Sequence, residues 1–173
     1  NQKLEQMVEE KVREISESQL ATIHALSELV ESRDVETGGH IKRTRNYCRL
    51  MAMEMMQSPR FYGRVDKQFL DNIYQAAPLH DIGKFGIPDN ILLKPEQLTE
   101  DEYTAIKAHP IIGANIIGHL GLMSEEQTIV RHHHERWDGT GYPQRIQGDK
   151  IPLMARIVAI ADVFDCLRAK RPY

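Results

Sequence analysis

The sequence predicts an all-α protein. Apolar residues recur at the three- and four-residue spacing of helices through most of the chain, and no stretch alternates apolar with polar residues as a half-buried strand does. Helix-start signals and links that contain Pro or Gly separate the helical stretches. Because 173 residues leave room for one domain of ordinary size and an appendage, we expect a single helical core.

Residues 1–33 form the predicted appendage. This segment contains neither Gly nor Pro, and five apolar residues fit a heptad seam that Gln19 and Thr22 interrupt. The five are Val8, Val12, Ile15, Leu26 and Leu29. The pattern predicts one long helix with weak coiled-coil character. Such a helix could pack on its own domain, but its charged, uncapped beginning favours a connector from an upstream regulatory domain, with a homodimer formed through the helix.

Residues 34–173 form the predicted main domain. A helix over 41–56 ends before a Ser-Pro pair, because the residue before a proline disfavours helical geometry. A second helix over 66–80 is expected to kink at Pro78. The Phe-Gly-Ile-Pro stretch at 85–88 predicts a turn.

Two capping boxes mark further helices. Residues 99–102, Thr-Glu-Asp-Glu, start a helix that ends near residue 108, and Pro110 suits the first turn of the next helix. Residues 124–127, Ser-Glu-Glu-Gln, start the helix that runs into His132.

The last part of the chain predicts a loop followed by a helix. Residues 136–150 contain three glycines and a proline, a composition typical of a loop. Pro152 then opens an apolar helix that extends through about residue 167.

Composition excludes several classes of protein. The net charge of -3 argues against binding to duplex nucleic acid, and no apolar run approaches the length that spans a bilayer. The N-terminus lacks the basic-then-apolar layout of a signal peptide, so we expect a cytoplasmic protein. The only two cysteines, Cys48 and Cys166, are far apart and predict two buried free thiols.

Histidines beside carboxylates are the strongest chemical signal. Of eight histidines, five stand at predicted helix ends or near an acid. With their acidic neighbours they are Glu36 and His40, His80 and Asp81, His109, and His133 and His134. Asp162 lies within an apolar run, and a lone buried carboxylate is costly unless it is paired or binds a metal. Imidazole and carboxylate without thiolate suit iron, manganese, nickel or zinc in a hydrolytic site.

The other three histidines predict no role at the site. His24, in the N-terminal helix, and His119, before a glycine, fit surface or packing positions. His132 ranks below its two neighbours in the histidine triple.

A series of motifs in this order resembles the HD-GYP domain, a branch of the HD metal-dependent phosphohydrolases. The resemblance covers about residues 34–173. The motifs are His80-Asp81-Ile82-Gly83-Lys84, Gly86-Ile87-Pro88-Asp89, Ile91-Leu92-Leu93-Lys94-Pro95, His133-His134-Glu135, Asp138-Gly139, Gly141-Tyr142-Pro143 and Ala161-Asp162-Val163-Phe164-Asp165. It implies an HD-type helical bundle in bacterial two-component signalling that hydrolyses the second messenger cyclic di-GMP at a centre of two or three metals.

The same resemblance assigns residues to the centre. It implies that His40, His80, Asp81 and Asp162 form the core metal-binding set and that His109, His133 and His134 hold a second metal. Glu36 matches the acid of members with three metals, and Lys84 and Arg171 match cations that bind phosphate. Because family members continue beyond the position of Tyr173, we expect a C-terminally truncated domain.

Ligand counting supports a centre with several metals. Two roughly octahedral ions need about twelve coordination positions, which five histidines, Asp81 as a bridge, Asp162 and Glu36 nearly fill. We expect a metal-bridging hydroxide to attack a phosphodiester, with Lys84 and Arg171 holding non-bridging oxygens. Iron or manganese is the first choice of metal, with nickel or zinc as alternatives.

The loop Gly141-Tyr142-Pro143 has two interpretations. It is either an ordered loop packed over the metal ligands or, as the resemblance implies, a docking site for diguanylate cyclase domains. Arg43, one turn after His40, could reach substrate, but a structural salt bridge is the favoured interpretation.

Three functions remain open. The first is hydrolysis of cyclic di-GMP to the linear dinucleotide and, because Glu36 is present, on to GMP. The second is hydrolysis of another cyclic dinucleotide such as cyclic GMP-AMP. The third is a cyclic-dinucleotide sensor or interaction module of low activity.

Overall fold

The computed structural model describes residues 2–33, 39–119 and 124–168 and confirms the all-α prediction, since these residues form helices and connecting segments without a strand. No helix in this described part of the chain is long and apolar enough to cross a membrane. The α-helices are α1 (Gln2–Arg33), α2 (His40–Gln57), α3 (Lys67–Ala76), α4 (Asp89–Leu92), α5 (Glu100–Ile106), α6 (His109–His119), α7 (Ser124–His132) and α8 (Leu153–Arg168).

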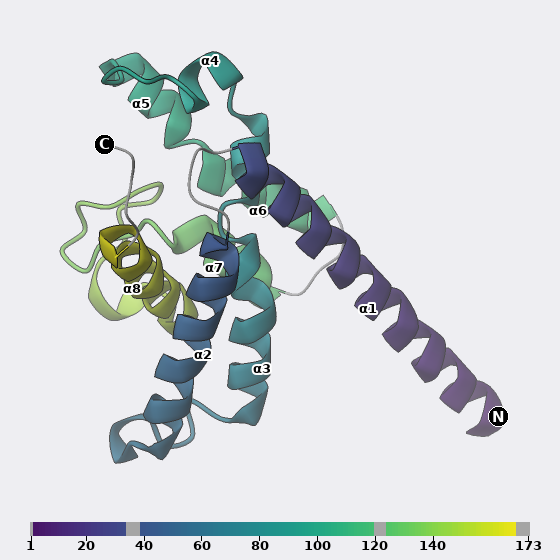
Figure 1. The fold of residues 1–173 in the computed structure, drawn as a ribbon. Helices are drawn as coiled ribbons and strands as arrows, with labels where there is room; N and C mark the ends of the chain where they lie inside the picture. Colours follow the sequence, from purple (N-terminus) through teal and green to yellow (C-terminus); the bar gives the residue numbers. More distant parts are fainter. Residues whose placement is uncertain (1, 34–38, 120–123, 169–173) are drawn as a thin grey trace.

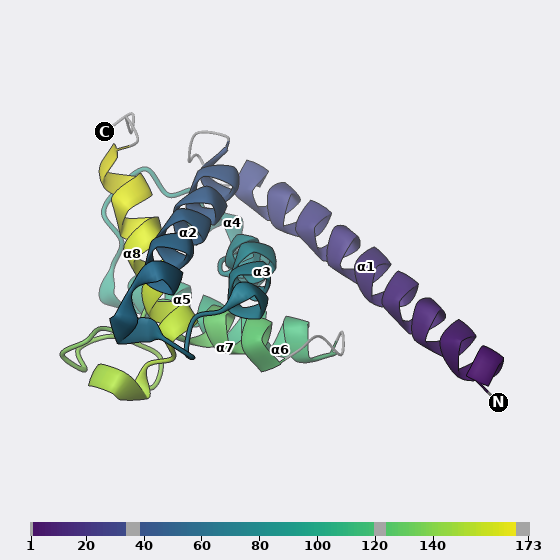
Figure 2. The same cartoon turned by 90° about the horizontal axis from the view of Figure 1, so that it is seen from below.

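The body of the molecule is a bundle in which α2 lies between α3 and α8 (Figure 1). Helices α6 and α7 pack against each other, and α7 also contacts α3 and α8. Helices α4 and α5 lie at one end of the bundle, whereas α1 projects away from it (Figures 1 and 2).

Small buried side chains bring the bundle helices close together. Cys48 and Ala52 of α2, Ala76 of α3 and Ala161 of α8 are almost completely buried in the main apolar cluster. Burial raises the pKa of the Cys48 thiol to about 12, so this cysteine behaves as a small apolar residue. Cys166, also predicted to be buried, is only half-buried.

Helix α1 packs on its own domain over part of its length, whereas its interpretation as a connector from an upstream domain stays a prediction. Its second half packs on the bundle through the buried side chains of Ile23, Ser27 and Val30. His24 Nε2 lies 2.8 Å from the carbonyl oxygen of Gln75, which gives His24 the packing role expected of it. The first half extends beyond the bundle.

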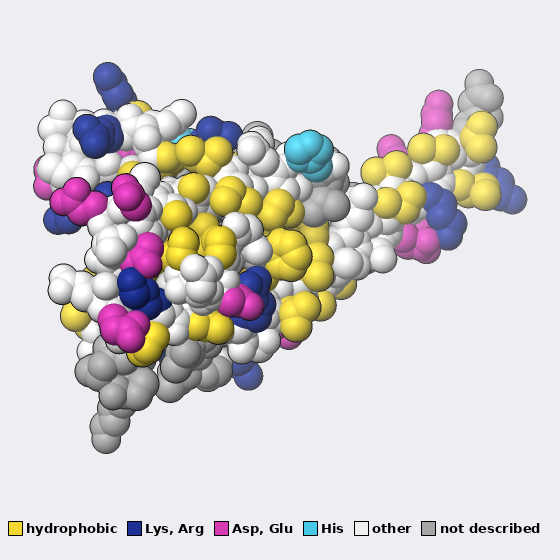
Figure 3. Space-filling model, turned by 90° about the horizontal axis from the view of Figure 1, so that it is seen from above, with side chains coloured by type: hydrophobic (Ala, Val, Ile, Leu, Met, Phe, Trp, Pro, Cys, Tyr) yellow, Lys and Arg dark blue, Asp and Glu magenta, His cyan; other side chains and the backbone are white. Residues whose placement is uncertain are grey.

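All five residues of the heptad seam are exposed. Val8, Val12, Ile15, Leu26 and Leu29 are 44–58% exposed, so the seam faces away from the bundle. Figure 3 shows hydrophobic side chains along the projecting part of α1 and over a broad patch on the body.

The helix predicted over 66–80 ends four residues early as an α-helix. Asp66 caps its start, because its carboxylate accepts a hydrogen bond from the amide of Phe69 at 2.8 Å. The end comes near Pro78, which has no N–H to donate to the carbonyl oxygen of Tyr74. The Nε of Arg45 donates to that oxygen instead, at 2.9 Å. The chain continues as a 3₁₀ turn, η2 (Ala77–Leu79), which includes Pro78 and ends just before His80.

The turn predicted over 85–88 divides between two elements. A 3₁₀ helix, η3 (Ile82–Gly86), ends within it, and Pro88 then precedes the short helix α4. A further 3₁₀ turn, η4 (Gly148–Lys150), interrupts the loop predicted over 136–150.

The capping box at 99–102 forms as predicted. The Thr99 hydroxyl accepts from the Glu102 amide at 3.3 Å, and the Glu102 carboxylate accepts from the Thr99 amide at 2.8 Å. Helix α7 begins at Ser124, as predicted. The second capping box depends on the side chain of this residue, and that side chain lies outside what the structure describes.

Candidate metal centre

Seven of the eight predicted metal-binding residues come together in two groups. One group contains Asp81, His109, His133 and His134, and the other contains His40, His80 and Asp162. Within each group the candidate ligand atoms all lie within 4.8 Å of one another. The eighth residue, Glu36, and the predicted phosphate-binding Arg171 lie outside the described residues.

Ends of helices deliver most of these side chains. His40 is the first residue of α2, after Gly39 in the left-handed region at φ 98°. His80 follows η2, His109 begins α6, and His133 follows α7. Asp162 instead lies within α8, which packs on α2 and so places the carboxylate beside His40.

Close contact between η3 and α6 positions Asp81 beside His109. A Cβ atom on Gly83 would lie 1.9 Å from the carbonyl oxygen of His109 and 2.6 Å from the amide nitrogen of Gly113. Only a glycine permits this approach. As a result Asp81 Oδ1 lies 3.1 Å from His109 Nε2.

The four buried imidazoles share one orientation. Each Nδ1 donates a hydrogen bond to a fixed acceptor, so the lone pair of each Nε2 points toward the centre. The donors are His40, His80, His109 and His133, and their acceptors are Asp165 Oδ2 at 2.7 Å and the carbonyl oxygens of Ala77 at 2.7 Å, Ile106 at 2.8 Å and Val130 at 2.8 Å.

This orientation leaves acceptor atoms facing one another. The Nε2 atoms of His109 and His133 lie 3.2 Å apart, yet both rings carry their hydrogen on Nδ1. Within the described part of the chain, His40 Nε2, His80 Nε2 and Asp81 Oδ1 are buried without a hydrogen-bond partner. Converging buried acceptors are unfavourable unless a cation lies between them, so the donor set fits divalent metal ions.

The histidines of the first group are poor bases. Burial lowers the pKa of His133 to about 4, although the neighbouring Asp81 carboxylate opposes this shift. Burial, together with the charge of His133, also lowers the pKa of His134 far below its ordinary value. Both rings are therefore neutral near pH 7, the form that binds metals.

Asp81 connects the two groups. Its Oδ1 lies 3.1 Å from His109 Nε2 and 3.6 Å from His133 Nε2, whereas Oδ2 lies 3.5 Å from His80 Nε2. The ammonium of Lys84 contacts Oδ2 at 2.9 Å. Burial opposes ionisation of Asp81, but the charge of Lys84 and the neighbouring imidazoles outweigh it and hold its pKa well below the ordinary value.

Asp165 holds the second group in place. It is almost completely buried in α8, accepts from His40, and binds Arg43 through Nε at 2.7 Å and Nη2 at 3.0 Å. Arg43 therefore has the structural salt bridge that was favoured for it. The sequence showed Asp165 only as part of a motif, although its position three residues after Asp162 on one helix was a usable signal.

The loop Gly141-Tyr142-Pro143 packs over the first group. The Tyr142 ring stacks on His134 with centroids 4.7 Å apart and an interplanar angle of 25°. A Cβ on Gly141 would lie 2.3 Å from the amide nitrogen of Arg136, so the loop needs glycine there. These contacts support the interpretation as an ordered loop over the ligands.

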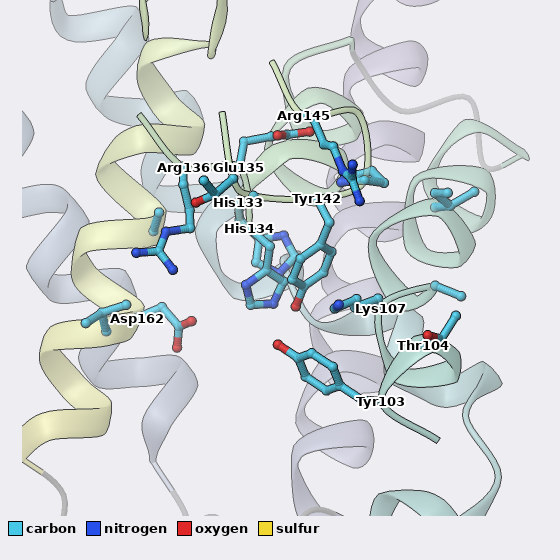
Figure 4. Close-up of a pocket in the computed structure, with 17 residues that line it drawn as sticks. Tyr103, Thr104, Lys107, His133, His134, Glu135, Arg136, Tyr142, Arg145 and Asp162 are labelled. Carbon is cyan, nitrogen blue, oxygen red and sulfur yellow. The ribbon is translucent and has the colours of Figure 1, made fainter. Parts of the chain in front are cut away.

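A cleft of about 870 Å³ opens beside the centre. His133, His134 and Asp162 line it together with three cationic side chains, Lys107, Arg136 and Arg145 (Figure 4). Sequence reasoning missed these cations, because the link between α5 and α6, which contains Lys107, and the loop after α7 meet only in the folded chain.

The remaining histidines take no part in either group. His119 Nδ1 lies 2.6 Å from the carbonyl oxygen of Asn115, and His132 Nδ1 lies 2.9 Å from that of Thr128. Both contacts lie within one helix, as expected of histidines outside the site.

Comparisons with known proteins agree with this geometry. A family model described as an HD domain matches residues 24–173. A cyclic di-GMP phosphodiesterase of Vibrio cholerae is 44% identical over 167 residues, which cover 92% of this chain and 34% of that protein.

Two further relatives carry related names. The 3'3'-cGAMP-specific phosphodiesterase 2 of the same organism is 42% identical over 162 residues, which cover 92% of this chain and 30% of that protein. The cyclic di-GMP phosphodiesterase response regulator RpfG of Xanthomonas campestris is 40% identical over 172 residues, which cover 98% of this chain and 43% of that protein. The chain thus spans less than half the length of each of these three relatives. Because the family model matches most of the sequence, the chain belongs to the HD domain family.

Proposed function

We propose that this chain is the catalytic domain of a phosphodiesterase that hydrolyses cyclic di-GMP with two or three divalent metal ions. The observation that carries the proposal is the pair of ligand groups joined through Asp81, with buried acceptors that lack a partner in the described residues. The cyclic di-GMP phosphodiesterases among the relatives support the choice of substrate.

Each group would hold one ion. His109, His133, His134 and Oδ1 of Asp81 would hold the first, and His40, His80, Asp162 and Oδ2 of Asp81 the second. When bound, such ions act as Lewis acids toward phosphoryl oxygens and lower the pKa of a coordinated water. Imidazole and carboxylate donors favour iron or manganese, with nickel or zinc as alternatives. Glu36 would contribute to a third ion.

The chain's own residues would orient the substrate. The low pKa of Asp81 keeps its carboxylate charged, and Lys84 fixes that carboxylate through Oδ2 while remaining half-buried beside the centre. Arg136 lies on the Asp162 side of the cleft, whereas Lys107 and Arg145 lie on the Tyr142 side (Figure 4). These cations would attract a dianionic dinucleotide, and Arg171 would bind its phosphate.

The test combines elemental analysis with product analysis. Protein loaded with manganese or iron is expected to hold at least two ions per chain and to convert cyclic di-GMP to the linear dinucleotide. Asp81→Asn should lower the number of ions bound per chain and reduce turnover by about a hundredfold. Asp71→Asn, an exposed carboxylate on α3, is the matched control and should change neither. A metal-loaded protein that leaves cyclic di-GMP intact would overturn the proposal.

The end product tests the role of Glu36. With a third ion the reaction should continue to GMP, and Glu36→Gln should stop it at the linear dinucleotide. Accumulation of only the linear product by the wild-type chain would contradict a three-metal centre.

A second candidate substrate is 3'3'-cGAMP, because one relative of similar identity is named for it. The metal ions held by the two ligand groups would contact the phosphates of either dinucleotide. A side-by-side comparison of the two substrates decides between them.

Partners of the chain are also proposed. The response regulator among the relatives supports an upstream regulatory domain attached through α1, whose exposed seam would pair with a second copy. Docking of diguanylate cyclase domains on the loop Gly141-Tyr142-Pro143 stays a prediction from the resemblance.

A further inference from the structure

We propose that Tyr103 and Lys107 of the α5 region form a nucleobase subsite that distinguishes guanine from adenine. Tyr103 would stack on the base, and Lys107 would donate hydrogen bonds to O6 and N7 at its edge. This inference rests on the proposed function and adds the group that reads the base, which the phosphate-binding metal groups cannot do.

Tyr103 and Lys107 line the same cleft as the metal-binding histidines. The two residues are four apart and share a face of the helical segment, and Lys107 Nζ lies 4.1 Å from the centre of the Tyr103 ring. Tyr103 is 48% exposed, so much of its ring is open to the cleft. Its hydroxyl points into the cavity toward Tyr142 (Figure 4).

The other aromatic ring of this wall is already engaged. Tyr142 stacks on His134, and Lys107 Nζ lies 5.9 Å from its ring centre. Tyr103 is therefore the tyrosine that can accept a base, with the lysine ammonium held between the two rings.

The ammonium of Lys107 is available to a ligand. Glu102, the acid that precedes this pair on α5, is bound instead by Lys94, whose Nζ lies 2.7 and 2.8 Å from the two carboxylate oxygens. No carboxylate in the described ranges lies within salt-bridge distance of Lys107. The two lysines thus differ in role, since one is neutralised and the other faces the cleft.

The chemistry of this pair favours guanine. A stacked base and a cation bind the same face of an aromatic ring, so an incoming base would displace the ammonium from that face to the edge of the base. Guanine presents two acceptors there, O6 and N7, whereas adenine presents one acceptor and the N6 amino donor. An ammonium can only donate, so it would pair well with guanine and poorly with adenine.

The experiment compares three dinucleotides with one substrate that has no base. The metal-loaded wild-type chain and its variants are assayed with cyclic di-GMP, 3'3'-cGAMP, cyclic di-AMP and bis(p-nitrophenyl) phosphate, which reports on the metal centre alone. Lys107→Met should raise the KM for cyclic di-GMP about tenfold and lower the preference for guanine over adenine by about the same factor. Hydrolysis of bis(p-nitrophenyl) phosphate should fall no further than it does in Arg145→Gln, since this substrate makes no base contact and loses only the charge of the lysine.

Variants of the ring separate stacking from the hydroxyl group. Tyr103→Phe keeps the aromatic face and should bind all dinucleotides as wild type does. Tyr103→Ala removes the face and should raise the KM of every dinucleotide about tenfold. The thermal midpoint of each variant is measured to show that the fold is retained.

Arg145→Gln is the matched control for charge. This variant removes one positive charge from the same cleft and leaves Tyr103 unchanged. It should therefore weaken the binding of all three dinucleotides by one common factor. If Lys107→Met does the same, Lys107 supplies only charge and the inference is wrong.

A failure of the proposed function would give a different experimental result from a failure of the subsite. In that case wild-type protein would hydrolyse bis(p-nitrophenyl) phosphate but no cyclic dinucleotide. Calorimetric titration of the metal-loaded chain with GMP and AMP would then test the subsite directly. Tighter binding of GMP that Lys107→Met abolishes would support the subsite, and equal binding of the two nucleotides would overturn it.

Discussion

Single residues at helix ends prepare the centre before any metal binds. His80, His109 and His133 each donate from Nδ1 to the carbonyl oxygen three residues earlier. The last carbonyl groups of a helix have no intrahelical partner, so these hydrogen bonds satisfy the carbonyl oxygens of Ile106 and Val130. The Ala77 carbonyl oxygen also accepts from the His80 amide, at 3.4 Å. Each bond from Nδ1 fixes which nitrogen faces the centre. One local interaction thus serves both the helix end and the ligand.

Asp165 performs this task for His40 and gives a residue-scale prediction. Asp165→Asn should weaken metal binding at the group of His40, His80 and Asp162 by about 10- to 100-fold, because the ring loses its charged acceptor. Calorimetric metal titration measures the affinity, and Asp71→Asn serves as the control. An unchanged affinity with an unchanged thermal midpoint would show that Asp165 does not orient His40.

Glu126 gives a second prediction, on stability and pH. Its side chain is 6% exposed, Oε2 has no hydrogen-bond partner among the described residues, and burial raises its pKa above the ordinary 4.5. Folding therefore favours the protonated acid. The associated stability is present below pH 4.5 and is lost as the pH rises through the raised, folded-state pKa.

Glu126→Gln removes this titration. The stability of the variant relative to wild type should therefore increase by on the order of 1 kcal/mol between pH 4 and pH 7. Urea unfolding of both proteins in the presence of chelator measures the difference at each pH. A difference that does not change with pH would contradict the raised pKa.

At the scale of elements, the sequence predicted a helix boundary correctly where the two residues that form the cap lie in one stretch of chain. The Thr99 capping box is such a case and formed as predicted, and the cap that Asp66 gives α3 is equally local. The end of α3 was predictable only in part, because Pro78 marks it locally but Arg45, which binds the Tyr74 carbonyl that Pro78 leaves free, comes from α2. The elements η3 and α4 were missed for the same kind of reason, since packing on α6 rather than periodicity sets η3.

The same distinction between local and long-range signals holds for the candidate centre. Sequence motifs, together with histidines at helix ends or near acids, predicted the residues of both groups, but Tyr103, Lys107, Arg136 and Arg145 belong to no motif that indicates a site. They line one cleft only because α5 and the loop after α7 approach each other in the fold.

The contact between η3 and α6 gives an element-scale prediction. Gly83→Ala should lower the free energy of unfolding by about 3 kcal/mol, because its Cβ would overlap the His109 carbonyl oxygen and force the two elements apart. Urea unfolding measures this change, and metal titration should show weaker binding at Asp81.

Gly86→Ala is the matched control within η3. The three atoms nearest to its Cβ would all belong to the Ile112 side chain, the first at 3.0 Å, and this side chain can adjust. We expect a loss of less than about 1 kcal/mol. Equal losses for the two variants would show that backbone contact at Gly83 does not hold η3 on α6.

The exposed seam of α1 gives a prediction on assembly. Val12 and Ile15 are each 57% exposed on the projecting part of the helix. We expect the chain to dimerise through this seam, and replacing both residues with lysine should give a monomer by light scattering while the thermal midpoint of the bundle stays unchanged. Met7→Lys, an exposed residue off the seam, should leave the dimer intact. A wild-type chain that is monomeric at all concentrations would contradict the pairing.

At the scale of the whole molecule, the centre lies where most of the bundle meets. The two ligand groups draw side chains from α2, α6 and α8 and from the segments that follow η2 and α7. One apolar cluster packs α2, α3 and α8, and a second packs the end of α1 against α6 and η3. Between them the metal-free protein buries acceptors that face one another, which opposes folding. Metal binding should therefore stabilise the whole bundle rather than a single loop.

Removal of metal tests this coupling. An ion present at a hundred times its dissociation constant adds about 2.7 kcal/mol to the stability of the folded state, which for a domain of this size raises the thermal midpoint by about 5–10 °C. We expect chelator to lower the midpoint by this amount and manganese or iron to restore it. His109→Ala should lose most of the metal-dependent shift, whereas His119→Ala, which changes an exposed histidine on the same helix, should retain it. If metal loads the protein without moving the midpoint, the ions bind the unfolded chain as tightly as the folded one, and the fold does not assemble the two ligand groups into a centre.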